Sequence, residues 1–125
     1  MGLSKPKNIT VAGGGMEMEL LWENASLTSS FAPQTVSINF EECDLFLIVA
    51  VHAVDAPITC FSNIIKPGDK GSIRTFAKGV QHFRDFDSTN TGITFANTFK
   101  PNSSDSINNY TIPYKVYGIK GVKTV

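Results

Sequence analysis

The chain of 125 residues carries 11 basic and 11 acidic side chains, and 42% of its residues are hydrophobic. That length is typical of one domain with a sizeable core. Because the net charge is zero, no long-range field attracts nucleic acid or an anionic membrane, and neither is an expected partner. The longest apolar run, residues 45–51, is far shorter than the roughly 20 residues that span a bilayer, so no membrane insertion is expected.

Residues 1–15 differ in composition from the rest of the chain. They lack the apolar segment of a secretory signal, so no targeting signal is predicted. Residues 8–12 suit a short strand, and the three consecutive glycines that follow suit a flexible hinge. We expect an N-terminal arm over residues 1–15 and one domain over residues 16–125. The arm packs either on its own domain or, as the hinge favours, on a neighbouring subunit. The residues predicted to carry this assembly contact are Ile9, Val11, Gly13, Gly14 and Gly15.

Beyond the arm, polar and apolar residues alternate with a period of two, which is typical of β-strands. Residues 16–23 are good helix formers, but the run is short and uncapped and follows glycines, so a first strand is predicted there instead. Residues 35–40 alternate cleanly, whereas residues 45–51 are apolar on both faces, which predicts a central strand covered on each side. Further strands are predicted over residues 58–65, 72–77, 80–86, 93–99 and 110–119.

Short segments rich in Gly, Pro, Asn and Ser separate these strands. Residues 66–71 and 88–92 are predicted turns, and residues 100–109 are a predicted polar loop. Seven or eight short strands divided by such turns predict an all-β fold, an antiparallel β-sandwich of jelly-roll-like type. The residues expected in its core include Trp22, Val36, Ile38, Leu47, Val49, Phe95, Ile112 and Val116.

Two cysteines and two histidines are the side chains best suited to catalysis or metal binding. Cys43 and Cys60 lack the spacing of a metal or redox motif, and a core of this size does not require a disulfide, so both are predicted to be free and buried. His52 and His82 fall in different predicted strands, with no further ligand or nucleophile at matching spacing. We predict strand-end or surface histidines and no metal site.

The acidic residues do not form a recognisable site. Residues 85–90 begin like a calcium loop, but Asn90 and Ala96 stand where the glycine and glutamate of that loop belong, so a hairpin turn is predicted. Glu41 and Glu42 are predicted to lie in a solvated turn. No pair of carboxylates is singled out for glycoside hydrolysis, and no phosphate loop follows the glycines. We therefore expect no enzyme activity, no catalytic residues and no cofactor.

Five segments of the chain together resemble a small β-sandwich module of tail, baseplate and fibre proteins from phages and prophages of Gram-positive bacteria. The segments are ELLW (19–22), FAPQTV (31–36), CDLFLIV (43–49), TGITF (91–95) and NYTIPYKVYGIK (109–120). The resemblance covers residues 16–122. It implies that the first segment opens the sandwich, that the second leads the second strand, and that the last closes it. It implies no catalytic residues.

The resemblance also implies a virion location and a homo-oligomer, with a trimer as the first choice, in contact with other virion proteins. Members of the family often form the C-terminal part of longer polypeptides, whereas this module follows a 15-residue arm, so a tail and a capsid location both stay open. The expected function is a virion structural protein of the tail or fibre type that contacts host cell-wall glycan. Two alternatives stay open: a capsid decoration protein anchored through its arm, and a carbohydrate-binding module outside viruses.

A glycan site needs aromatic faces for the apolar side of a sugar ring and short polar side chains for its hydroxyl groups. The last predicted strand and the loop before it offer both. Tyr114 and Tyr117 rank below Tyr110 for exposure, and at least one tyrosine is expected to pack in the core. The predicted glycan contacts are Asn102, Ser103, Asn108, Asn109 and Tyr110.

Overall fold

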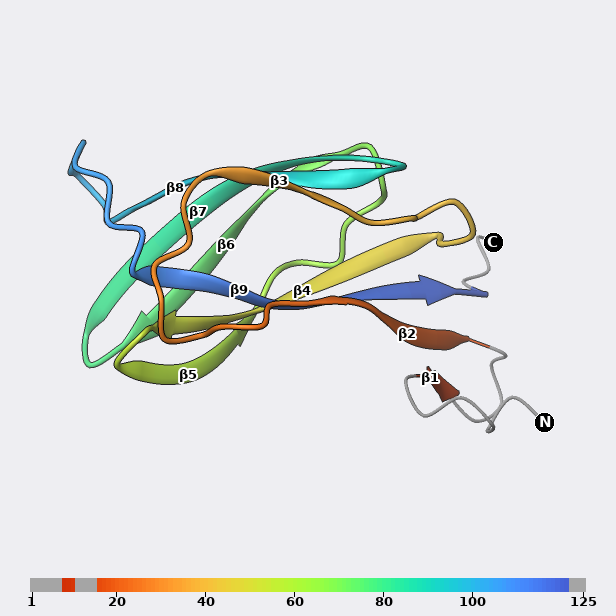
Figure 1. The fold of residues 1–125 in the computed structure, drawn as a ribbon, viewed down its shortest axis with the longest axis horizontal. Coiled ribbons are helices and arrows are strands. Elements are labelled where there is room, and N and C mark those ends of the chain that lie inside the picture. Colours follow the sequence, from red (N-terminus) through yellow and green to blue (C-terminus); the bar gives the residue numbers. More distant parts are fainter. Residues whose placement is uncertain (1–7, 11–15, 122–125) are drawn as a thin grey trace.

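The computed structural model describes residues 8–10 and 16–121, and within these ranges it contains nine strands and no helix (Figure 1). No helix that could cross a membrane therefore occurs in the described part of the chain. The strands are β1 (Asn8–Thr10), β2 (Glu17–Glu23), β3 (Gln34–Ser37), β4 (Leu45–Ala53), β5 (Ala56–Phe61), β6 (Lys70–Ala77), β7 (Val80–Thr89), β8 (Gly92–Phe99) and β9 (Tyr110–Lys120).

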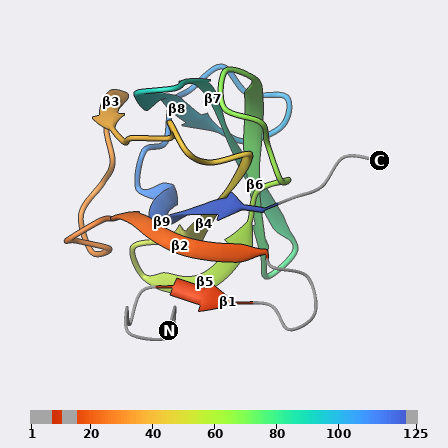
Figure 2. The same cartoon turned by 90° about the vertical axis from the view of Figure 1, so that its right-hand side faces the viewer.

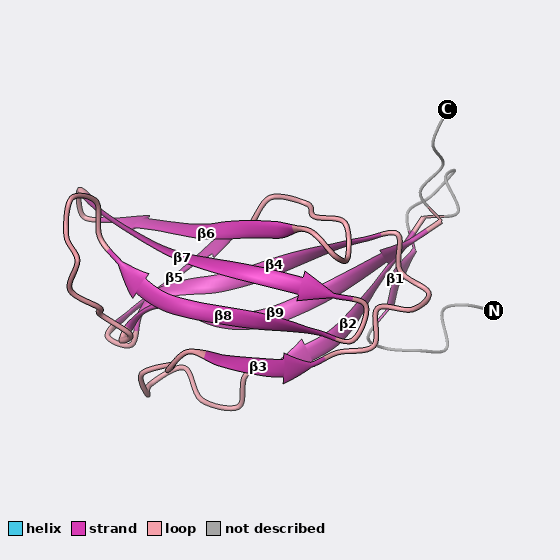
Figure 3. Ribbon diagram, turned by 90° about the horizontal axis from the view of Figure 1, so that it is seen from above, coloured by secondary structure: helices cyan, strands magenta, loops and turns pink. Residues whose placement is uncertain are grey.

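The strands form two antiparallel sheets that face each other (Figures 2 and 3). Sheet A has the strand order β1-β2-β9-β4-β5, and sheet B has the order β3-β8-β7-β6. The predicted antiparallel β-sandwich is confirmed. The first long strand pairs with the last, and β3 pairs with the last but one, as in a jelly roll, while β4–β5 and β6–β7–β8 are joined as successive hairpins.

The strand prediction for residues 16–23 is confirmed, because pairing with β9 outweighs local helix propensity. Leu20 pairs with Tyr117 and Trp22 with Val116, so Leu21 is an extra residue that makes a β-bulge. The bulge allows two consecutive side chains, Leu21 and Trp22, to pack against the core.

The core lies between the two sheets. Val36, Ile38, Phe95, Ile112 and Val116 are buried in it as predicted. Trp22 is partly buried against it and Val49 is buried.

The prediction for Leu47 is wrong. Phe46 and Ile48 on either side of it are fully buried in the core, so the period of two turns Leu47 to the opposite face of sheet A, where it is half-buried. The first part of β4 is thus covered on one face only, whereas every residue from Val49 to Ala53 is buried.

Several boundaries differ from the prediction. The strand expected over residues 58–65 begins at Ala56 and ends at Phe61, and Pro57 lies within this edge strand, where a missing N–H is tolerated. Cys43 and Cys60 are free as predicted, but both are half-buried, because Cys60 lies on this edge strand and Cys43 in the turn before β4. Glu41 and Glu42 form an exposed turn, as predicted.

Part of the N-terminal arm adds a strand to its own sheet. Asn8 pairs with Glu19 and Thr10 with Glu17, so residues 8–10 extend sheet A beside β2. Ile9 is the only predicted arm residue in the described ranges, and Val11, Gly13, Gly14 and Gly15 lie outside them. The contact of the arm with a neighbouring subunit stays a prediction.

Candidate functional site

The β4–β5 turn, the β6–β7 turn and the start of β9 lie at the same end of the sandwich (Figure 1). Residues of these segments line a small pocket. Its volume is about 170 Å³. Tyr110, the aromatic residue ranked first from the sequence, forms part of its wall. The other lining residues of this end pocket are His52, Asp55, Ala56, Ala77, Lys78 and Val80.

The β6–β7 turn holds Lys78 at the rim of the end pocket. Lys78 and Gly79 have φ angles of 53° and 77°, so both central residues of this two-residue turn are left-handed. Such a turn matches the right-handed twist of the strands that it joins. A lysine in this conformation is uncommon, and the turn places Lys78 in the lining of the pocket together with Asp55 of the β4–β5 turn.

His52 is the last but one residue of β4, which agrees with a strand-end position, but both histidines contradict the predicted surface exposure. His52 and His82 are 4% and 3% exposed, and their ring centroids are 5.1 Å apart. His52 comes from sheet A and His82 from sheet B, so the contact crosses the interior of the sandwich. The signal was present in the sequence: His82 shares its strand phase with Phe86, which is in the core.

The two buried imidazoles contact further side chains next to the pocket. His52 Nδ1 lies 3.0 Å from Thr75 Oγ1, which lies 3.0 Å from Thr111 Oγ1. The ring of His82 stacks on that of Tyr110, with centroids 4.0 Å apart and planes 13° apart. Among the described residues, His82 Nδ1 has no hydrogen-bond partner.

The environment keeps both histidines neutral near pH 7. Burial lowers the pKa of His52, and Asp55 opposes this effect in part. Burial also lowers the pKa of His82, and the neighbouring His52 and Lys100 lower it further. The pair therefore acts as an uncharged aromatic cluster in the folded protein at neutral pH.

Arg84 lies beyond the histidines and is fully buried, on the same face of β7 as His82 and Phe86. Its Nε donates to the Thr111 carbonyl at 3.0 Å, and its Nη1 donates to the Ala96 carbonyl at 2.7 Å. Nη2 lies 3.5 Å from the Tyr110 carbonyl, and the cation lies 5.2 Å from the Phe31 ring centroid. Burial lowers the pKa of Arg84 to about 10, so the group stays charged at neutral pH.

An unusual backbone conformation brings two successive carbonyls to Arg84. In a regular strand, neighbouring carbonyls point to opposite sides, but Thr111 has a φ of 51°. The carbonyls of Tyr110 and Thr111 consequently both accept from Arg84, and Thr98 Oγ1 donates to the Tyr110 carbonyl at 2.8 Å. A β-branched residue rarely adopts this conformation, so the hydrogen bonds around it hold a strained backbone.

The structure separates the predicted glycan contacts. Asn102 and Asn109 are exposed, and Ser103 and Tyr110 are half-buried. Asn108 is occupied internally, because its Nδ2 donates to Asn97 at 2.8 Å and its Oδ1 accepts from the Thr98 N–H at 2.9 Å. Only Tyr110 of this set lines the end pocket.

Tyr114 and Tyr117 are half-buried, as Tyr110 is, so the ranking of the three tyrosines by exposure stays a prediction. Tyr114 is the extra residue of a bulge in β9 and packs partly against the core, and the ammonium of Lys115 lies 4.7 Å from its ring centroid. Tyr117 is half-buried beside Leu47.

Within the described ranges, no three His, Cys, Asp or Glu side chains are placed to hold a metal ion together. Comparison of the chain with models of protein families, with curated proteins and with solved structures finds no match. The end pocket can accept hydrogen bonds through Asp55 and donate them through Lys78 beside an aromatic ring, a combination that suits a polar ligand with an apolar face.

Proposed function

We propose that the protein is a structural module of a bacteriophage virion, of the tail or fibre type, and that it contacts host cell-wall glycan through the end pocket. The observation that supports a glycan contact is the position of Tyr110, which is half-buried in the wall of a pocket that also holds Asp55 and Lys78. The virion assignment rests on the sequence resemblance, whose longest segment becomes β9 in the middle of sheet A.

The size and chemistry of the pocket favour the end of a glycan chain. A sugar ring presents hydroxyl groups, which Asp55 accepts from and Lys78 donates to, and an apolar face, which the Tyr110 ring can cover. Pockets that enclose a whole small-molecule ligand usually measure roughly 300 to 1,000 Å³. At about 170 Å³, this pocket accommodates a terminal sugar rather than an internal stretch of polysaccharide.

Self-assembly forms part of the proposal, with a trimer as the first choice and other virion proteins as further partners. The five large apolar side chains that stand exposed in the described ranges all fall between residues 58 and 80, in or beside the neighbouring edge strands β5 and β6 and at the start of β7. Strand β5 carries no charged residue, and charges are what usually protect an edge from pairing with another chain. These residues are Ile58, Phe61, Ile64, Phe76 and Val80.

Binding to purified Gram-positive cell walls tests the glycan contact. Asp55→Asn and Lys78→Asn should each weaken binding by about tenfold or more, which corresponds to one lost charge-assisted hydrogen bond. Asparagine tolerates the left-handed conformation of residue 78, so the turn should persist. The matched controls are Asp69→Asn and Lys66→Asn, which lie in the turn before β6 and should bind like the parent.

Equal binding by all four variants, or none by the assembled parent protein, would contradict the glycan contact. Immunogold labelling of virions separates the remaining readings. Label on the tail supports the proposal, and label on the capsid shell supports a decoration protein anchored through the arm. Glycan binding by a protein that no virion contains would support a carbohydrate-binding module outside viruses.

A further inference from the structure

A second hollow lies in the outer face of sheet B and is separate from the end pocket. Its volume is about 370 Å³, within the range of ligand-binding pockets. Phe86 and Phe95 send their rings into the core, so their backbone and that of Gly71 form the floor. The exposed residues of the rim are Lys70, Asp85, Asp87, Thr94 and Ala96.

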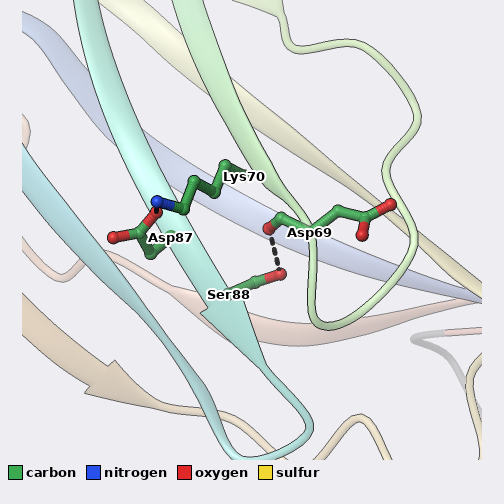
Figure 4. A network of polar contacts seen from close by, with 4 residues as sticks. All are labelled: Asp69, Lys70, Asp87 and Ser88. Atoms are coloured by element: carbon green, nitrogen blue, oxygen red, sulfur yellow. Dashed lines mark hydrogen bonds and ion pairs between the residues drawn. The ribbon is translucent and has the colours of Figure 1, made fainter.

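Strand register places a row of polar side chains across this hollow. Lys70 pairs with Asp87, Asp87 with Thr94, and Thr94 with Thr35, so the row crosses all four strands of the sheet. Lys70 Nζ lies 3.8 Å from Asp87 Oδ1 (Figure 4), and the hydroxyl oxygens of Thr94 and Thr35 lie 2.8 Å apart. The row thus presents an ammonium, a carboxylate and two hydroxyl groups to solvent.

A row of aromatic and cationic side chains runs parallel to it on the same face. Arg74 pairs with Phe83, and Phe83 pairs with Phe99. The guanidinium carbon of Arg74 lies 5.7 Å from the Phe83 ring centroid, and the Phe83 and Phe99 centroids lie 6.1 Å apart. Phe83 precedes Asp87 by four strand residues, or about 13 Å at 3.3 Å per residue. Asp85 lies between them.

Together the two rows form one continuous surface along β7, which we call the β7 strip. Its residues are Lys70, Arg74, Phe83, Asp85, Asp87, Thr94 and Phe99. We propose that the β7 strip binds a neutral oligosaccharide that lies lengthwise along β7, with its apolar ring faces on Phe83 and Phe99 and its hydroxyl groups on the polar row. The class of ligand rests on the proposed function, whereas the location does not.

The charges of the strip select this occupant over others. The two carboxylates, Asp85 and Asp87, balance the two cations of the strip, Lys70 and Arg74, so the strip has no net positive charge to attract the phosphates of a nucleic acid or a teichoic-acid chain. A protein interface tends to exclude charged groups from its centre, yet here exposed charges line the hollow itself. A neutral, hydroxyl-rich chain leaves the Lys70–Asp87 pair intact and hydrogen-bonds to it.

A microarray of neutral Gram-positive cell-wall polysaccharide fragments is the probe, followed by titration of the bound fragments in solution. The double variants Phe83→Ala with Phe99→Ala, and Asp85→Asn with Asp87→Asn, should each lower affinity at least tenfold. The control is Phe61→Ala on β5, a phenylalanine more exposed than Phe83 and Phe99, which should bind like the parent. The carboxylate variants change exposed side chains only, so they keep the test valid if the phenylalanine pair is needed for folding.

Backbone amide shifts during the titration locate the ligand. Shifts over residues 83–87 and 94–99 support the inference. Parental affinity in both double variants, with shifts only at Asp55 and Lys78, would overturn it while leaving the proposed function in place. If the strip binds a fragment but virions do not contain the protein, only the proposed function is contradicted. If no fragment on the array binds, the proposed function and the inference about the strip are both contradicted.

Discussion

The imidazole of His82 lies flat against the phenol ring of Tyr110, with ring centroids 4.0 Å apart. The contact joins a residue in the wall of the end pocket to one that is 3% exposed between the sheets. Because His52 touches both rings, a change of charge on either histidine acts directly on the pocket wall. The stability of this end of the sandwich should therefore depend on pH.

Acidification is expected to destabilise the protein below about pH 6.5. The folded state lowers the pKa of His52 and of His82 below the ordinary value of 6.5, so the unfolded chain takes up protons first. Their contribution to the free energy of unfolding is complete above pH 6.5 and is lost as the pH falls toward the folded-state pKa values. Urea unfolding at pH 5 to 8 measures the slope of the free energy of unfolding against pH. Arg84 stays charged over this range and does not contribute to the slope.

Two phenylalanine variants distinguish the contributions of His52 and His82 to this pH dependence. His82→Phe keeps the stack on Tyr110 and removes a buried nitrogen that has no partner among the described residues, so it should flatten the slope at little cost in stability at pH 8. His52→Phe breaks the contact with Thr75 and should cost about 1 kcal/mol at pH 8. An unchanged slope in the double variant would show that other groups cause the acid sensitivity.

Replacing Arg84 should be strongly destabilising. Arg84→Met removes the donors to the Thr111 and Ala96 carbonyls and leaves them buried without this partner, at about 3 kcal/mol in total. The stability of Arg84→Lys should fall between that of the parent and that of Arg84→Met, because one ammonium group cannot make all the hydrogen bonds of the guanidinium. Urea unfolding at pH 7 is the measurement. Arg74→Met, at an exposed position of the adjacent strand pair on β6, is the control and should change stability by less than about 0.5 kcal/mol.

Ser88 is expected to anchor the turn before β6. Its hydroxyl donates to the Asp69 carbonyl at 2.6 Å (Figure 4). The same oxygen accepts from the Gly68 N–H at 3.0 Å. Ser88→Ala should cost about 1 to 2 kcal/mol and speed hydrogen exchange at Gly68. Ser104→Ala, in the exposed loop after β8, is the matched control. Unchanged exchange at Gly68 in the Ser88 variant would mean that the backbone alone holds the turn.

Neither cysteine is expected to be essential. A variant with Cys43→Ser and Cys60→Ser should lose about 1 kcal/mol, and its melting temperature, like that of the parent, should not depend on reductant. Burial raises the pKa of the Cys43 thiol, so at pH 8 it should react with iodoacetamide more slowly than free cysteine does. A parent protein that melts at a lower temperature only when reductant is present would reveal a disulfide.

The period of two along the chain was enough to predict the all-β class, most strand positions and most of the core. That pattern is local: Val36, Ile38 and Phe95 are buried because alternate side chains of a strand face the same side. Even β2 was predictable despite its helix-forming residues, since the glycines before it and the strands that follow favour a sheet.

Only the tertiary structure decided which side chains meet. Leu47 misses the core because of its phase relative to Phe46, and the bulges at Leu21 and Tyr114 shift register in ways that alternation does not show. The contact of His52 with His82 depends on packing between strands of different sheets, and the β7 strip depends on the register of the β6–β7–β8 hairpins. Alternation along a single sequence indicates which residues of a regular strand share a face. Bulges, and partners across a sandwich, are set by sheet order and register, which follow from the packing of the whole chain.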